Sequence, residues 1–156
     1  MPTDHPDPTG FLESSPLVPI EIDALDGRVR YVGRQAGELL GYPTEAWREE
    51  GFWVAKVLPD DQATLEGVRR NTREARGRHE VDYRLECADG RVIWVSELLR
   101  YADSGSGPVL RGFLWNVTDR KRQEVALWKS EERLRALLRR APDALILTDY
   151  EGTVLN

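Results

Sequence analysis

Few residues of this chain carry reactive side chains, and those few are widely separated. Cys87 is the single cysteine, which excludes an internal disulfide and any metal site built from several cysteines. The two histidines, His5 and His79, leave little for histidine-based catalysis or zinc binding. No paired carboxylates, nucleophile–histidine set or phosphate-binding glycine loop stands out from the background. We therefore expect no catalytic residues and no metal site.

One enzyme class still has candidate residues in this sequence. A small isomerase on a curved α+β sheet would need acidic and phenolic side chains together in a roomy buried cavity. Asp82 and Glu97 are the candidate acids, and Tyr83 is the candidate phenol. We expect neither carboxylate to share a strand face with Tyr83, so this enzyme class ranks last.

Composition and charge limit the classes of protein further. The 156 residues are 40% hydrophobic and 31% charged, which indicates a globular chain of about one domain plus some extra length. No stretch approaches the roughly 18 apolar residues of a membrane span, and the N-terminus lacks a signal-peptide pattern. We expect a cytoplasmic protein without direct membrane insertion.

The net charge of −5 conceals a basic segment at 120–140, which holds eight Lys or Arg and three Glu. Its basic run, residues 120–122, is too short for a basic-zipper contact with DNA and lacks a polar base-reading pattern. We interpret the segment as a solvated helix face and expect no nucleic-acid partner. The same interpretation applies to the arginines of an earlier predicted helix: Arg69, Arg70, Arg73 and Arg76.

The apolar pattern predicts an α+β fold with helices in the middle of the chain. Residues 18–33 read as a hairpin that turns at Asp26-Gly27. Two short helical pieces follow, with Gly41 as a C-cap of the first. A longer helix within 58–77 should be capped by Asp60 or Asp61. Its buried stripe comprises Leu65, Val68, Thr72 and Ala75.

Three longer strands come next. Residues 78–87 alternate cleanly, which places Val81, Tyr83, Leu85 and Cys87 on one face. A turn at Asp89-Gly90 leads to two strands, 91–101 and 108–117, that are apolar on both faces. A sheet with two apolar faces must be covered on both. Helices should cover one face, and the N-terminal segment, another domain or a second subunit should cover the other.

The last predicted element is one long helix. Its apolar residues recur at alternating spacings of three and four, as in a coiled-coil seam, at Leu127, Ser130, Leu134, Leu137 and Ala141. After it, residues 142–156 repeat the pattern of the first hairpin: Pro16, Asp23, Gly27 and Val29 correspond to Pro142, Asp149, Gly152 and Val154. We expect a flexible tail (1–15), a domain (16–118), a helical linker (119–140) and the truncated start of a second domain (141–156).

Three segments carry a resemblance to a known family. They are FWVAKVLPDD (52–61), DYRLECADGRVIWV (82–95) and GFLWNVTDRKRQE (112–124). In this order they resemble the PAS domain with a PAC-type C-terminal half, as in bacterial sensor histidine kinases and related signalling proteins. The resemblance covers about residues 16–124 and implies a five-stranded antiparallel sheet with short helices on one face and a long exit helix. The chain departs from the family pattern at Leu58, where the family has histidine, and at Asn116, where it has aspartate.

The resemblance also implies a search for a ligand between sheet and helices. The residues argue against a photoadduct flavin, because the only cysteine lies on a strand and Leu114 occupies the position of the flavin-reading glutamine. They argue against haem, because residues 6–78 contain no histidine and we expect His79 to be a solvated strand-end residue. The inward faces look nearly apolar, which also argues against a di-acid sensor. A small apolar or aromatic ligand would then contact Tyr83, Leu85, Gly112 and Leu114; its identity is unknown.

The resemblance implies a regulatory module of a multidomain signalling protein, such as a histidine kinase or a cyclic-dinucleotide enzyme. A shift in the sheet would pass through Asn116, Thr118 and Asp119 into the exit helix. The helix would form a homodimer through Leu127, Leu134 and Leu137 and connect to downstream PAS and output domains. The alternative is a ligand-free protein–protein interaction module.

Overall fold

The computed structural model describes residues 15–140. The predicted N-terminal tail up to residue 14, and the predicted second-domain start at 141–156, lie outside this range. The chain divides into two compact units, of which the first ends at Thr118 and the second begins at Asp119.

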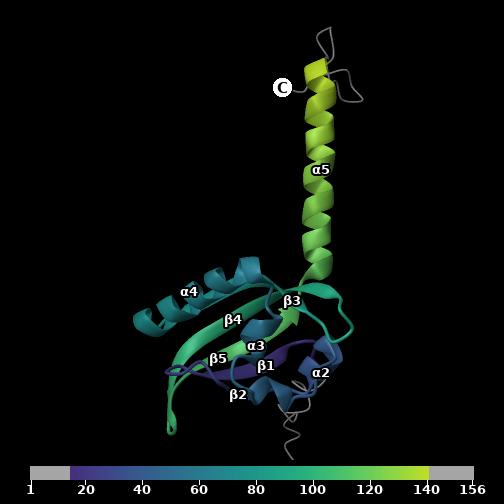
Figure 1. Ribbon diagram of the computed structural model, residues 1–156. Coiled ribbons are helices and arrows are strands. Elements are labelled where there is room, and N and C mark those ends of the chain that lie inside the picture. Colours follow the sequence, from purple (N-terminus) through teal and green to yellow (C-terminus); the bar gives the residue numbers. More distant parts are fainter. Residues whose placement is uncertain (1–14, 141–156) are drawn as a thin grey trace, which may run out of the picture. The chain divides into compact units, whose positions relative to one another are not determined.

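The first unit is built on a five-stranded sheet, and the prediction of this α+β fold is confirmed (Figure 1). All neighbouring strands run antiparallel, in the order β2-β1-β5-β4-β3. The strands are β1 (Val18–Asp23), β2 (Val29–Val32), β3 (Arg78–Glu86), β4 (Val92–Ser104) and β5 (Gly107–Asn116). The first hairpin turns at Gly27, whose φ of 77° suits glycine.

The helices lie over one face of this sheet (Figure 1). They are α2 (Gln35–Leu40), η1 (Ala46–Arg48), α3 (Phe52–Lys56) and α4 (Pro59–Ala75). Gly41 ends α2 in the left-handed conformation, as predicted, and its N–H donates to the Gly37 carbonyl. The predicted aspartate cap of α4 is wrong. Leu58 is the N-cap residue without a side-chain bond, and Asp61 instead accepts hydrogen bonds from the backbone N–H and the guanidinium of Arg84.

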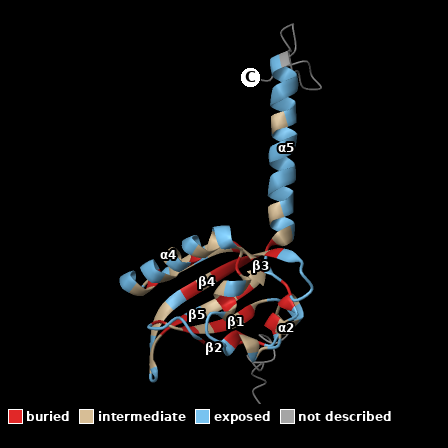
Figure 2. Ribbon diagram, in the orientation of Figure 1, coloured by how far each residue is buried: buried red, intermediate tan, exposed pale blue. Residues whose placement is uncertain are grey.

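Buried residues gather between the helices and the inner face of the sheet (Figure 2). Of the predicted α4 stripe, Leu65 and Thr72 are buried, whereas Ala75 in the last turn is exposed. Four aromatic rings pack edge to face under the short helices, with centroids 5.1–6.5 Å apart: Tyr42, Trp47, Phe52 and Trp53.

The outer face of the sheet is apolar as well. It carries the half-buried side chains of Trp94, Leu98, Phe113 and Trp115. A shallow groove of about 750 Å³ crosses it, and Pro19, Tyr31 and Phe113 contribute to its lining. The expectation of a cover on this face stays a prediction.

Helix α5 (Thr118–Arg140) is the long helix predicted at the C-terminal side. Its apolar side chains are exposed, with 63% for Leu127, 58% for Leu134 and 63% for Leu137, and Trp128 is 62% exposed. None of the helices in residues 15–140 combines the length and the apolar character that a membrane crossing needs.

Candidate functional site

A buried polar cluster lies at the centre of the domain, around Glu97 on β4. The β3–β4 register pairs Val81 with Glu97, and the β4–β5 register pairs Glu97 with Leu114. Because directly paired residues of an antiparallel sheet share a face, Glu97 points inward together with Tyr83. Its side chain is 0% exposed. A carboxylate in this position has to find its hydrogen-bond donors inside the protein.

Three side chains supply those donors. Arg69 on α4 binds the carboxylate with two nitrogens, Nε at 3.0 Å from Oε1 and Nη2 at 2.5 Å from Oε2. The Tyr83 hydroxyl donates to Oε2 at 2.8 Å, and Nε2 of His79 lies 3.2 Å from Oε1. Trp53 extends the cluster, since its indole N–H donates to the Tyr83 hydroxyl at 3.1 Å and its ring lies 4.6 Å from the Arg69 guanidinium.

The cluster changes the ionisation of its members. Burial alone would raise the pKa of Glu97, but the charge of Arg69 and the hydrogen bonds from His79, Arg69 and Tyr83 lower it from 4.5 to about 2. Burial and the neighbouring Glu97 charge raise the pKa of Tyr83 well above its usual value. Glu97 is therefore a carboxylate held by donors and Tyr83 a neutral phenol, so the cluster connects α4 to β3 and β4 rather than offering a free base.

Several sequence expectations are wrong at this cluster. Glu97 does share a face with Tyr83, and the inner faces are not nearly apolar. His79 is not a solvated strand-end residue, because its side chain is 9% exposed and its Nδ1 lies 2.5 Å from the Thr72 hydroxyl. Arg69 does not belong to a solvated face, because its side chain is 13% exposed. The β3–β4 register places His79, Tyr83 and Glu97 on one side of the sheet, and Arg69 reaches Glu97 from α4.

The predicted pocket residues lie on the same inner face. Tyr83, Leu85 and Leu114 are buried in the core. Gly112 is paired with both Leu99 and Ile20. A Cβ at Gly112 would lie 1.8 Å from the Leu98 carbonyl oxygen, so a glycine is needed where β5 passes β4.

A hollow of about 370 Å³ opens beside the cluster, between α4, α3 and the β1–β2 turn. Its apolar lining comes from Ile22, Val54 and Leu110. Three arginines at helical spacing on α4 line another wall: Arg69, Arg70 and Arg73. Arg70 is exposed, as predicted, whereas Arg69 and Arg73 are partly buried at this wall.

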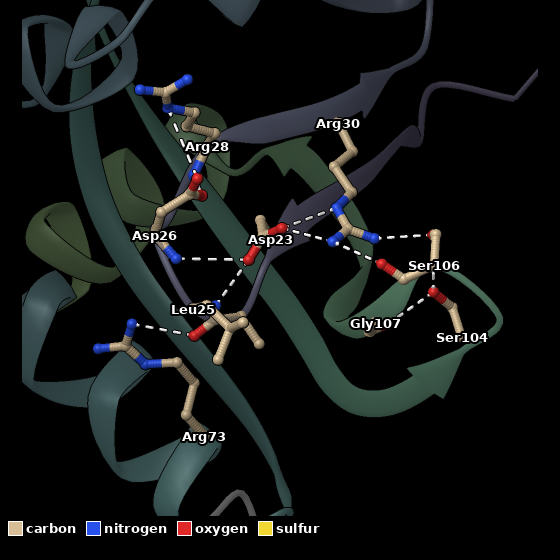
Figure 3. A network of polar contacts seen from close by, with 10 residues as sticks. Asp23, Leu25, Asp26, Arg28, Arg30, Arg73, Ser104, Ser106 and Gly107 are labelled. Atoms are coloured by element: carbon tan, nitrogen blue, oxygen red, sulfur yellow. Dashed lines mark hydrogen bonds and ion pairs between the residues drawn. The ribbon is translucent and has the colours of Figure 1, made fainter.

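The β1–β2 turn beside this hollow is held by Asp23 (Figure 3). Its carboxylate accepts from the backbone N–H groups of Leu25 and Asp26 and from the Arg30 guanidinium. The Leu25 N–H and Arg30 lower the pKa of Asp23. Arg73 of α4 donates to the Ala24 carbonyl at 3.1 Å, which ties the helix to the same turn.

The predicted relay residues lie where β5 ends. The Asn116 side chain accepts from the Thr118 N–H at 2.8 Å. The Thr118 hydroxyl accepts from the Trp94 N–H at 3.0 Å, and the Val117 N–H donates to the Trp94 carbonyl at 2.9 Å. Asp119 is exposed and pairs with Arg122 at 3.2 Å. Asn116 and Thr118 are therefore tied to each other and to β4, through a backbone contact that sequence patterns do not reveal.

Within the described part of the chain, no group of three or more His, Cys, Asp and Glu side chains is placed to hold a metal ion.

Comparisons with known proteins agree with this architecture. Residues 29–113 match the family described as PAS fold. The chain is 26% identical over 122 residues to the Sensor protein FixL of Bradyrhizobium diazoefficiens, a match covering 76% of the chain but 24% of that protein. The chain thus spans about a quarter of the length of this curated relative.

Solved structures show the same fold. The N-terminal domain of a diguanylate cyclase with PAS/PAC sensor from Marinobacter aquaeolei superposes with a TM-score of 0.61 at 26% identity, covering 67% of this chain and 98% of that one. A sensory box histidine kinase/response regulator from Burkholderia thailandensis gives 0.66 at 23% identity, covering 82% and 97%. The fold, its strand order and these matches define a sensory domain. The chain belongs to the PAS family.

Proposed function

We propose that this chain is a regulatory PAS module that passes a change in its sheet to helix α5 and through it to a dimeric output. The observation that carries the proposal is the junction at Thr118. The Trp94 N–H donates to the Thr118 hydroxyl, and the Val117 N–H donates to the Trp94 carbonyl. These two hydrogen bonds connect the start of α5 to β4. Any movement of β4 therefore reaches the first residue of α5 directly.

The central cluster offers a source for such movement. Glu97 and Trp94 lie three residues apart on β4, and Arg69 connects Glu97 to α4. A change in α4 thus acts on the strand that also holds Thr118. Asn116 and Thr118 are the proposed relay residues, and Asp119 follows them in the first turn of α5.

The proposed partner of α5 is a second copy of the same chain. Leu127, Leu134 and Leu137 recur at spacings of seven and three residues and are more than half exposed, which suits a coiled-coil seam. PAS domains commonly dimerise, and the Sensor protein FixL, which is similar to this chain, is longer than it. We further propose a PAC-type C-terminal half, a second PAS domain from residue 141, a kinase or cyclase output, and a location in the cytoplasm.

A change at the centre of the seam tests the dimer. Leu134→Asp should convert a dimer to a monomer, because a charge in the seam of both helices has to be desolvated. Ala136→Asp is the matched control, since the same side chain then lies on an exposed position outside the seam. Sedimentation velocity of the full chain measures both. An unchanged dimer in Leu134→Asp, or equal loss in both variants, would contradict the seam.

The alternative is a ligand-free interaction module. The packing of Trp53, Tyr83 and Arg69 around Glu97 favours it, because these side chains fill the space between sheet and helices at the centre of the domain. Native mass spectrometry of the purified chain distinguishes the two functions. An empty dimer supports the interaction module, and a dimer with added mass supports a sensor.

A further inference from the structure

The hollow between α4, α3 and the β1–β2 turn has the features of a ligand site. Its volume of about 370 Å³ is in the range of small-molecule pockets, roughly 300–1,000 Å³. A smaller extension of about 50 Å³ shares five lining residues with it and reaches Trp47. The shared residues are Asp26, Gly27, Gly51, Val54 and Arg69.

Charge distinguishes the two ends of this space. At the α4 wall, Arg69 is occupied by Glu97. Arg73 donates to the Ala24 carbonyl in the β1–β2 turn, and Figure 3 shows it reaching this turn. Arg70 has no ion-pair partner among residues 15–140, so its guanidinium is available to an anion. Three acidic residues also line the hollow. Asp23 is paired with Arg30 and Asp26 with Arg28, so within the described residues Glu66 on α4 is the acid that opposes an anion there.

The inner end differs. Trp47 is 1% exposed, and its indole N–H is the one buried side-chain donor in the described chain without an acceptor. A buried N–H in this state favours a ligand oxygen. Asp26, Glu49 and Glu50 line the same extension and outnumber Arg28, which is paired with Glu50, so a second negative charge there would be repelled. The matching group is a neutral oxygen.

We propose that this hollow binds a small carboxylic acid with an apolar body and a neutral hydrogen-bonding oxygen at its far end. The carboxylate would pair with Arg70, the body would pack on Ile22, Val54 and Leu110, and the oxygen would accept from Trp47. Arg69 lines the hollow and also holds Glu97, so an occupied site touches the cluster that anchors β4. This last consequence rests on the proposed relay, whereas binding itself does not.

The test uses 4-hydroxybenzoate as the probe and the ¹⁵N-labelled full chain in NMR titrations at constant ionic strength. We expect saturable shifts that include the indole N–H signal of Trp47, with millimolar affinity. Three analogues separate the contacts. Benzoate lacks the far oxygen and should leave the Trp47 signal in place, 4-hydroxybenzamide lacks the charge, and terephthalate adds a second charge; each should bind more weakly.

Variants locate the charge. Arg70→Gln should weaken 4-hydroxybenzoate about tenfold, because one charge-assisted contact is lost. Glu66→Gln should tighten it, and Arg78→Gln, an exposed arginine on β3 outside the hollow, should leave it unchanged. The absence of saturable shifts up to about 10 mM, or equal affinity in Arg70→Gln, would overturn the site. The dimer of the proposed function is tested separately, by sedimentation of the Leu134→Asp variant. A failure of ligand binding at the hollow would therefore not contradict the proposed function.

Discussion

At the residue scale, Glu97 is the most constrained side chain of the domain. It is fully buried, charged and held by Arg69 of α4 and by His79 and Tyr83 of β3. A buried ion pair contributes little net stability compared with a well-packed apolar pair, but loss of one partner leaves the other charge buried alone. The cluster therefore fixes the position of α4 on the sheet more than it strengthens the fold.

The depressed pKa of Glu97 predicts a dependence of stability on pH. Its pKa falls from 4.5 to about 2, so its contribution is fully present above pH 4.5 and is lost as pH falls toward 2. The size is about 3 kcal/mol by linkage. Guanidinium unfolding at pH 7 and at pH 3 should show a smaller acid-induced loss in Glu97→Gln than in the wild type. Glu86→Gln, an exposed glutamate on β3, is the control.

At pH 7 the same variant should be destabilised by about 3–5 kcal/mol, since Arg69 stays buried without its carboxylate. Parallel losses of stability in the wild type and in Glu97→Gln between pH 7 and pH 3 would show that other carboxylates carry the acid transition.

At the element scale, alternation predicted which residues of β3 point inward, but the pairing of β3 with β4 was not predicted. Alternation placed Val81, Tyr83 and Leu85 on one face of β3, and these residues are indeed inward or buried. Glu97 was missed because polarity suggests an outward residue on an apolar strand. Counting back across the Asp89-Gly90 turn would have found it, since this hairpin pairs position 81 with position 97.

The contacts of the α4 arginines could not be predicted from the sequence, for a different reason. Arg69 and Arg70 are neighbours of the same type on one helix, yet one is bound to Glu97 and the other faces the hollow. Which arginine meets the sheet depends on how the helix is rotated and placed over it. That is a property of tertiary packing, which local spacing does not contain.

The junction of β5 and α5 carries a prediction at this scale. Thr118→Val keeps the shape of the side chain but removes the acceptor of the Trp94 N–H. We expect the Trp94 amide to exchange with solvent about fivefold faster, as a lost hydrogen bond of about 1 kcal/mol implies. Thr44→Val, at a half-buried threonine between α2 and η1, should leave this amide unchanged. Equal protection of Trp94 in Thr118→Val would remove Thr118 from the relay.

At the scale of the whole molecule, the two units differ in how they bury apolar side chains. Within the described residues, all buried hydrophobic side chains lie between Val18 and Val117. Helix α5 holds none of them, and its exposed leucines are the ones assigned to the proposed dimer seam. The first unit contains a complete sheet with its helices and a core of its own.

This division predicts that the first unit folds alone. A chain of residues 1–122 should unfold cooperatively, with a Tm within about 5 °C of the full chain at a concentration where the full chain is monomeric. Calorimetry measures both, and Leu134→Asp in the full chain controls for association. A broad transition in the shorter chain would mean that α5 contributes to the core.

The five tryptophans are divided between the units in a useful way. Trp128 is the tryptophan of α5 and is exposed, whereas Trp47 and Trp53 are buried in the first unit. Indole emission moves to longer wavelengths in water, so the red edge of the fluorescence spectrum belongs largely to the helix and the blue edge to the sheet domain. Intrinsic tryptophan fluorescence thus reports on each unit at a different wavelength. Changes in the environment of helix α5 and of the sheet domain can be followed separately without attaching a dye.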